Sequence, residues 1–148
     1  MTLPMPQPMT APTIIIHDLD HATAALAAAA RAGLAVELRS AAGAGAGLGP
    51  GVFKAITEQA FAHHADTHCI AVLDCGDEAG TALAAIRAGC RHVAIDLDPP
   101  ARDKLADLAA ARDIRLHARP AGPVLDLADV DDAPAALRIY LEGDNCDG

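Results

Sequence analysis

The stretches "RAGLAVEL" (residues 31–38) and "RAGCRHVAIDL" (residues 87–97) contain the same joint between a helix and a strand. In each, Arg-Ala closes an Ala-rich segment, and the glycine that follows supplies the left-handed conformation that ends a helix. An aliphatic run comes directly afterwards. Because the joint occurs twice, 56 residues apart, it predicts β-α units with parallel strands and right-handed crossovers.

Strand and helix signals alternate on both sides of these joints. Five strands are expected, at residues 13–17, 35–39, 69–73, 92–96 and 115–118. Helices are expected at about 20–33, 51–64, 78–89 and 100–112, with a last helix inside "DDAPAALRIYLE" (131–142). Carboxylates accept the free N–H groups at helix starts, so the expected N-caps are Asp20, Asp77, and Asp131 or Asp132. Pro99 and Pro100 suit the opening of the fourth helix.

The chain has 148 residues, and one α/β domain is expected over residues 13–143. Residues 1–12 hold four prolines, which remove backbone donors, so we expect a flexible arm there. The acidic tail 144–148 is expected to fray. Aromatic residues make up only 2% of the chain, so the core must consist of Ala, Leu, Ile and Val.

Composition also limits the partners. A net charge of −9 opposes a phosphate backbone, so no nucleic acid is expected. No apolar run reaches membrane-spanning length, so no membrane partner is expected either. The four cysteines show no C-x-x-C spacing and no cationic leader precedes an apolar run. A reduced, cytoplasmic protein is therefore the expectation.

The two faces of the expected sheet differ, because side chains alternate across a strand. One face is aliphatic: Ile14, Ile16, Val36, Leu38, Ile70, Val72, Val93, Ile95 and Leu116. The other is small or polar: Ile15, His17, Ala35, Glu37, Arg39, Ala71, Leu73, Cys75, His92, Ala94, Asp96, Arg115, His117 and Arg119. A doubly wound sheet needs apolar side chains on both faces. The pattern therefore favours a partial, half TIM-barrel-like layer of about five strands with helices on one side. A flavodoxin-like doubly wound sandwich is the alternative.

A sheet of this kind has free edges and an uncovered polar face. Unpaired strand edges are templates for further pairing, and a second subunit could cover the polar face. A homo-oligomer, most simply a dimer, is therefore expected.

A glycine-rich stretch, "GAGAGLGPG" (residues 43–51), follows the second strand. It matches neither G-x-G-x-x-G nor the G-K-[ST] ending of a P-loop. Backbone N–H groups in such a turn can nevertheless approach an anion, and the next helix adds its positive dipole end. Gly45, Gly47 and Gly49 are therefore expected to bind an anion, flanked by Arg39 and Lys54. The alternative is a mobile loop that only needs positive φ angles.

Charged side chains at the carboxyl ends of the strands define the candidate site. Glu37 and Arg39 lie on one face and can project into the concavity, although a structural ion pair with Asp96 or Arg115 is an equal alternative. "LDCGDEAG" (residues 73–80) lies where a strand meets a helix, the favoured ligand position in α/β sheets. The expected ligand-binding residues beside the glycines are Arg39, Asp74 and Asp96. The expected catalytic residues are Glu37, Cys75 and His117.

Cofactors are not indicated by any motif. Divalent metal would need several of His17, Asp18, Cys75, Asp96, Asp98 and His117 to converge, and their types suit Zn²⁺. No short ligand spacing supports this, so no metal site is predicted.

The segment "RAGLAVELRS" (residues 31–40) resembles the KDPG/KHG aldolase family at its second helix-to-strand joint. The resemblance implies a (βα) barrel in which Glu37 is the acid/base residue and Arg39 binds substrate. The family's Schiff-base lysine has no counterpart, because Lys54 and Lys104 both lie in expected helices, and the chain is short for a full barrel.

Two functions follow from these features. The first is binding of a small anionic metabolite, with lyase- or isomerase-like chemistry as its catalytic form. The alternative is a non-catalytic α/β module for oligomerisation or interaction. The sequence does not decide whether the chain is an enzyme.

Overall fold

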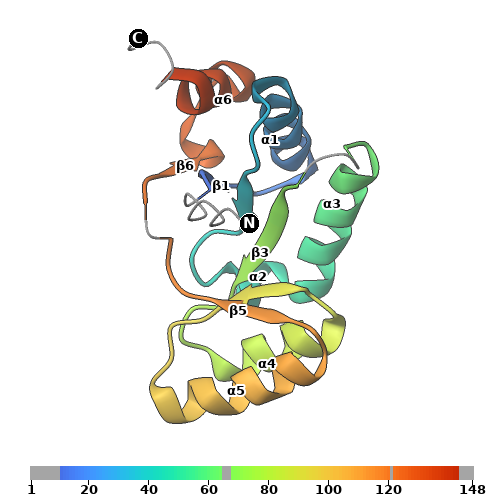
Figure 1. Ribbon diagram of the computed structural model, residues 1–148, viewed down its shortest axis with the longest axis vertical. Coiled ribbons are helices and arrows are strands. Elements are labelled where there is room, and N and C mark those ends of the chain that lie inside the picture. Colours follow the sequence, from blue (N-terminus) through green and yellow to red (C-terminus); the bar gives the residue numbers. More distant parts are fainter. Residues whose placement is uncertain (1–10, 65–67, 121, 144–148) are drawn as a thin grey trace, which may run out of the picture.

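Six parallel strands form one sheet in the order β5-β4-β3-β2-β1-β6 (Figure 1). The computed structural model describes residues 11–64, 68–120 and 122–143. Its strands are β1 Thr13–Ile15, β2 Glu37–Arg39, β3 Ile70–Asp74, β4 His92–Ala94, β5 Arg115–His117 and β6 Val124–Asp126. Its helices are α1 Leu19–Ala32, α2 Ala44–Leu48, α3 Pro50–Ala62, α4 Ala79–Ala88, α5 Pro99–Ala111, the short 3₁₀ turn η1 Leu127–Asp129, and α6 Ala133–Glu142.

The expected parallel β-α repeat is confirmed. All five predicted strands are present, although most are shorter than predicted, and each consecutive pair from β1 to β5 is parallel. β6 and the five-residue α2 were not predicted from the sequence. The expected flexible arm and acidic tail lie almost entirely outside the described residues.

Helix ends follow the expected chemistry with two corrections. Gly33 and Gly89 close α1 and α4 with φ values of 69° and 86°. The N-cap of α1 is Asp18, not Asp20, because the Asp18 carboxylate accepts the His21 N–H at 2.8 Å. Asp20 lies in the first turn of α1, where its charge favours the helix dipole.

At the other helix starts, α4 begins after Glu78 rather than Asp77, and no side-chain bond caps it. Asp132 caps α6 by accepting the Ala135 N–H at 3.2 Å, which confirms one of the two expected residues. Pro99 and Pro100 open α5 as predicted.

Neighbouring helices follow the order of the strands. α6 packs against α1, α1 against α3, α3 against α4, and α4 against α5. Figure 1 shows them as an arc, from α6 and α1 at one end, past α3, to α4 and α5 at the other. The described strands leave β5 and β6 as free edges that do not pair with each other, so the sheet is open and is not closed into a barrel.

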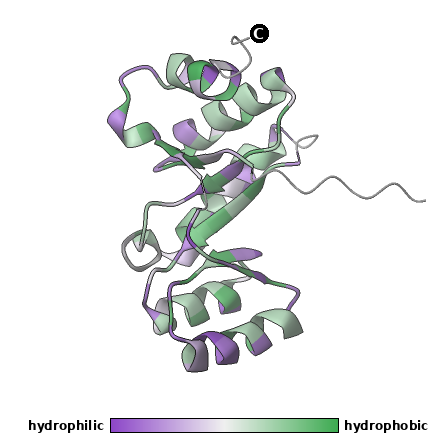
Figure 2. Ribbon diagram, turned by 60° about the vertical axis from the view of Figure 1, so that its left-hand side comes forward, coloured by the Kyte–Doolittle hydropathy of each residue, from purple (hydrophilic) through white to green (hydrophobic). Residues whose placement is uncertain are grey.

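The core lies between this arc of helices and one face of the sheet. Ile14 and Leu38 are neighbours in that face, as are Leu73 and Val93 on the next strands. Fully buried alanines let α1 lie close to the sheet: Ala22, Ala25 and Ala29. Figure 2 shows apolar segments along the sheet and hydrophilic residues distributed over the outer turns of α5. The expectation of a core built from Ala, Leu, Ile and Val is confirmed for most of the core cluster, which also contains Phe53, Cys69, Cys75 and Cys90.

The predicted faces are wrong on β3. The register places Ala71 beside Leu38, while Val72 lies beside Arg39. Val72 is fully buried but lies outside the core cluster, which contains Leu73 instead. The run "CIAVLD" (residues 69–74) is apolar on both faces, so alternation gives no parity there. We call the opposite side of the sheet, which carries Glu37, Arg39, His92 and His117, the polar face.

The error of one residue on β3 also applies to Cys75, which follows this strand. It was expected on the polar face, but its side chain is 1% exposed and belongs to the core cluster. The expectation that Cys75 points into the concavity is therefore wrong.

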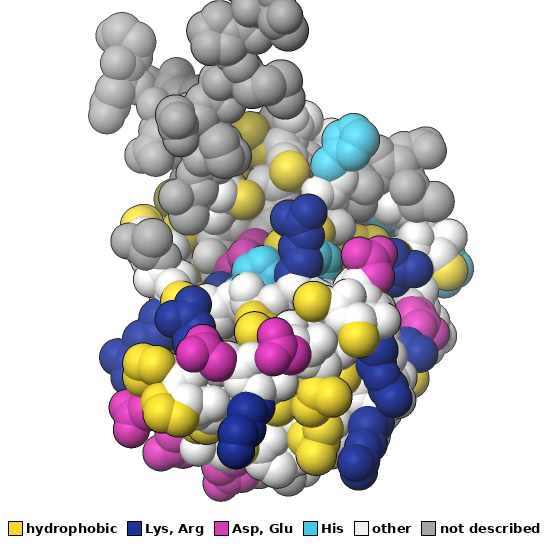
Figure 3. Space-filling view, turned by 60° about the horizontal axis from the view of Figure 1, so that its bottom comes forward, with side chains coloured by type: hydrophobic (Ala, Val, Ile, Leu, Met, Phe, Trp, Pro, Cys, Tyr) yellow, Lys and Arg dark blue, Asp and Glu magenta, His cyan; other side chains and the backbone are white. Residues whose placement is uncertain are grey.

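The outer surface over α4 and α5 carries charges of both signs. Figure 3 shows Lys and Arg side chains alternating with Asp and Glu on this face, with hydrophobic side chains in small groups between them. No helix in the described part of the chain is long and apolar enough to cross a membrane.

Two glycine substitutions test the helix-to-strand joint. Gly33→Ala places a Cβ on a residue at φ 69° and should lower the free energy of unfolding by about 1 kcal/mol. Gly80→Ala is the matched control, because Gly80 lies inside α4 with open space around it. It should leave stability unchanged or raise it by about 0.5 kcal/mol. Urea unfolding of both variants measures the difference, and equal effects would contradict the assigned C-cap.

Candidate functional site

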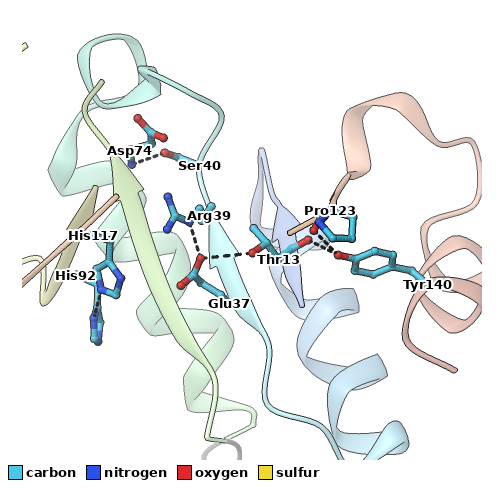
Figure 4. A network of polar contacts seen from close by, with 9 residues as sticks. All are labelled: Thr13, Glu37, Arg39, Ser40, Asp74, His92, His117, Pro123 and Tyr140. Carbon is cyan, nitrogen blue, oxygen red and sulfur yellow. Dashed lines mark hydrogen bonds and ion pairs between the residues drawn. The ribbon is translucent and has the colours of Figure 1, made fainter. Parts of the chain in front are cut away.

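A buried ion pair lies at the centre of the polar face (Figure 4). Arg39 Nε donates to Glu37 Oε2 at 2.5 Å, and Thr13 Oγ1 donates to the same oxygen at 3.5 Å. The Arg39 side chain is 5% exposed and that of Glu37 is 14% exposed. Glu37 and Arg39 therefore pair with each other rather than with Asp96 or Arg115.

The pair leaves one donor unused. Arg39 Nη1 is buried and finds no hydrogen-bond partner among the described residues. A buried charged donor without an acceptor lowers the stability of the fold, because it has lost its hydrogen bonds to water without forming one to the protein. The guanidinium is therefore only partly satisfied, and its Nη1 has donor capacity for an oxygen from outside the chain.

A groove of about 510 Å³ opens beside Arg39, at the carboxyl ends of the strands. We call it the carboxyl-edge groove. Its lining includes Ile15, Arg39, Ser40, Asp74, Asp96 and Arg119. Asp96 Oδ2 accepts from Arg119 Nη2 at 2.9 Å on the exposed side of the groove. Arg39, Asp74 and Asp96, all predicted to bind ligand, thus line one groove.

The glycine-rich stretch binds a carboxylate of its own chain. Asp74 Oδ1 accepts the Gly43 N–H at 3.1 Å and the Gly76 N–H at 2.8 Å. A Cβ on Gly76 would lie 3.4 Å from Gly43 Cα, so the two turns are in close contact. Ser40 Oγ completes the arrangement by accepting the Asp74 N–H at 2.8 Å (Figure 4). The start of the stretch is therefore fastened to the end of β3.

The three glycines predicted to bind an anion lie farther along. Gly45 and Gly47 belong to α2, and Gly49 is the N-cap of α3 with φ 88°. Among the described residues, those that line the carboxyl-edge groove do not include these three. Lys54, expected beside them, lines a different groove.

Two histidines are hydrogen-bonded to each other on the polar face. His92 Nδ1 and His117 Nε2 are 2.9 Å apart, so one ring donates and the other accepts. Burial lowers the pKa of His92, and His117 and Arg115 lower it further. Burial also lowers the pKa of His117, Glu37 opposes this, and Arg39 adds to it. The pair is therefore neutral at pH 7, and His117 lies within electrostatic reach of Glu37.

Cys75 does not share this environment. Burial raises the pKa of its thiol to about 12, and the Asp74 carboxylate adds to the effect. A thiol with this pKa carries no thiolate at neutral pH, and its side chain lies in the core. We therefore leave Cys75 out of the site that we propose.

A second polar pair was not predicted because β6 was missed. His17 Nε2 and Asp126 Oδ1 are 2.6 Å apart at the carboxyl ends of β1 and β6. Burial raises the pKa of Asp126, but the Ala128 N–H and His17 together bring it below the ordinary value. His92 was also absent from the predicted site, since its contact with His117 depends on the register of β4 and β5.

Metal-binding geometry is not found in the described part of the chain, where no three His, Cys, Asp or Glu side chains come together to hold an ion. No protein-family model matches the chain, and no curated protein sequence matches it either. The resemblance to KDPG/KHG aldolases therefore has no support beyond residues 31–40. What the fold and the site define is an α/β protein with an open parallel sheet and a groove at its carboxyl edge.

The histidine pair makes stability depend on pH. Both rings have a pKa lowered from 6.5 in the folded state, so the unfolded chain binds more protons below that pH. Stability from the pair is therefore complete above pH 6.5 and is lost as the pH falls below it. NMR titration of the ring protons should place both transitions below 6.5.

His117→Gln should weaken the loss of stability between pH 7.5 and 5.5, measured by urea unfolding. His63→Gln, at the exposed end of α3, is the matched control and should keep the parent profile. A ring of the pair that titrates at or above 6.5 would contradict the buried, neutral assignment.

Proposed function

We propose that this chain binds a small anionic metabolite in the carboxyl-edge groove and that Arg39 grips its carboxylate or phosphate. The observation that carries the proposal is the buried Nη1 of Arg39, which has no acceptor among the described residues while the guanidinium lines the groove. An oxyanion would supply that acceptor. Because Glu37 holds the Nε side, the guanidinium keeps a fixed orientation.

The position of the groove in the fold supports the same proposal. Ligands of open α/β sheets bind outside the carboxyl ends of the strands, where this groove lies. The order of helix packing, with successive helices side by side, is what a half TIM-barrel-like layer would give. In that arrangement the polar face is concave and is the surface that a ligand would meet.

Proton transfer is the chemistry that this face would support. Glu37 lies next to Arg39, and the neutral His92–His117 pair can accept a proton on one ring and release one from the other. Glu37 and His117 are not among the described residues that line the groove, so a lyase- or isomerase-like step would need a ligand that extends from Arg39 over the polar face, where either residue could act as the base. Arg39 would hold the negative charge that develops.

The binding proposal is tested with inorganic phosphate and malonate as probes. Either probe at 100 times its Kd should add about 2.7 kcal/mol to the free energy of unfolding. Arg39→Lys keeps the charge but loses the fork, and should weaken binding. Arg119→Met is the matched control, since Arg119 lines the same groove from its exposed side.

Arg39→Met alone would leave Glu37 buried without its partner, and should destabilise the fold by about 3–5 kcal/mol. The double variant Glu37→Gln with Arg39→Met removes both charges, and should fold without binding either probe. Calorimetric titration separates these cases. A double variant that binds as tightly as the parent, or a parent that binds neither probe, would refute the proposal.

The free edges favour a second candidate, self-association. β5 and β6 each leave one side unpaired among the described strands, and both are only three residues long. A second copy could pair along either edge and cover the polar face. Light scattering at micromolar concentration should then give at least twice the 15.1 kDa mass of the chain. A mass of one chain at every concentration would contradict it.

A further inference from the structure

A second groove, of about 470 Å³, opens at the opposite edge of the sheet, where β3 and β4 begin. We call it the amino-edge groove. One side of α3 forms a wall, and the turns that lead into the two strands form the other. Its lining includes Phe53, Lys54, Phe61, Cys69, Cys90 and Arg91.

Part of the lining of this groove is apolar, and two of these apolar side chains are aromatic. Phe53 and Phe61 are the only two phenylalanines in the sequence, and both line it. Phe53 is 3% exposed, and the Cys69 and Cys90 side chains beside it are 9% and 6% exposed. This placement brings two of the three aromatic residues of the chain to one groove. Phe61 is only partly buried, so an apolar ligand body that covers it gains free energy.

The polar side chains of the interior are already satisfied. Thr57 Oγ1 donates to the Phe53 carbonyl at 3.0 Å, so it requires no ligand atom. His92, at the start of β4, is neutral because burial lowers its pKa, and it is hydrogen-bonded to His117. The interior therefore offers contact surface without a charge.

The rim carries the charge instead. Lys54 and Arg91 contribute two positive charges, and Glu58 contributes one negative charge. Glu58 is 67% exposed and lies 3.5 Å from Lys54 Nζ, in a pair that solvent screens. The groove is thus locally cationic on a protein whose net charge is −9. The opposite wall does not crowd Lys54, because a Cβ on Gly89 would lie 3.5 Å from its Nζ and glycine has none.

We propose that the amino-edge groove binds an amphipathic carboxylate, such as a medium-chain fatty acid. Its apolar body lies against Phe53 and Phe61, and its carboxylate lies between Lys54 and Arg91. This site is separate from the Arg39 groove and does not depend on the function proposed there.

The thiols of Cys69 and Cys90 report on this site directly. Octanoate at ten times its Kd should slow their alkylation by N-ethylmaleimide about tenfold, because the bound acid covers them. Cys75 is the internal control, since it lies in the core and does not line the groove. Peptide mass spectrometry resolves the three rates. Equal slowing of all three would indicate only general stabilisation and would overturn the proposal.

Charge variants test the rim. Lys54→Met and Arg91→Met should each weaken octanoate binding about tenfold by calorimetry, and neither residue is buried. Lys104→Met is the matched control, because Lys104 is exposed on α5 and away from the groove. 1-Octanol, which has the same chain without the charge, should bind parent and variants equally. Octanoate binding that the rim variants leave unchanged would overturn the carboxylate assignment.

The other occupant to be distinguished is a second copy of this chain. It would protect Cys69 and Cys90 increasingly as protein concentration rises, without octanoate. That result, or an absence of octanoate binding to the parent, would also overturn the proposal. Acetate serves as the short-chain control and should bind at least tenfold more weakly than octanoate.

Discussion

The Glu37–Arg39 ion pair on a central strand decides how this sheet can be covered. Both side chains point to the same face, and both are largely buried. The pair has little water left to lose, but Arg39 Nη1 still lacks an acceptor among the described residues, and an apolar helix face would supply none. The helices instead lie next to one another along the aliphatic face, where the alanines of α1 allow close approach.

The polar groups at the carboxyl edge of the sheet are mostly bonded within the chain. At the carboxyl edge, the strands end in polar residues whose hydrogen bonds fasten turns, as the Asp74 carboxylate does for Gly43 and Gly76. A carboxylate held by two backbone N–H groups occupies the position that a phosphate takes in a nucleotide-binding loop. The backbone N–H groups of Gly43 and Gly76 are therefore used in a contact within the chain, and among the described residues Arg39 keeps a buried donor without an acceptor.

The order of alternation in the sequence explains which features could be predicted. On β2, "VELR" (residues 36–39) alternates apolar and charged residues, so the predicted faces were correct there. On β3 both faces are apolar, and the predicted assignment of side chains to faces is wrong by one residue. Cys75 was therefore predicted on the polar face, whereas it lies in the core. β6 has only three residues and no periodicity, and its place beside β1 depends on contacts with distant parts of the chain. That Arg39, Asp74 and Asp96 come together in one groove was predictable, because each lies at or near the carboxyl end of a parallel strand. The contact between His92 and His117 was not, since it depends on strand register.

The polar face also connects the two grooves physically. His92 lines the amino-edge groove and is hydrogen-bonded to His117 at 2.9 Å. The charges of Glu37, Arg39 and Arg115 act on His117, and of these three residues Arg39 lines the carboxyl-edge groove. An anion bound at Arg39 would offset the charge that lowers the pKa of His117, and would therefore raise the affinity of the histidine pair for a proton. By reciprocity, protonation of the pair would favour an anion at Arg39. If Arg39 binds an anion as we propose, proton binding at the histidine pair and anion binding would therefore depend on each other.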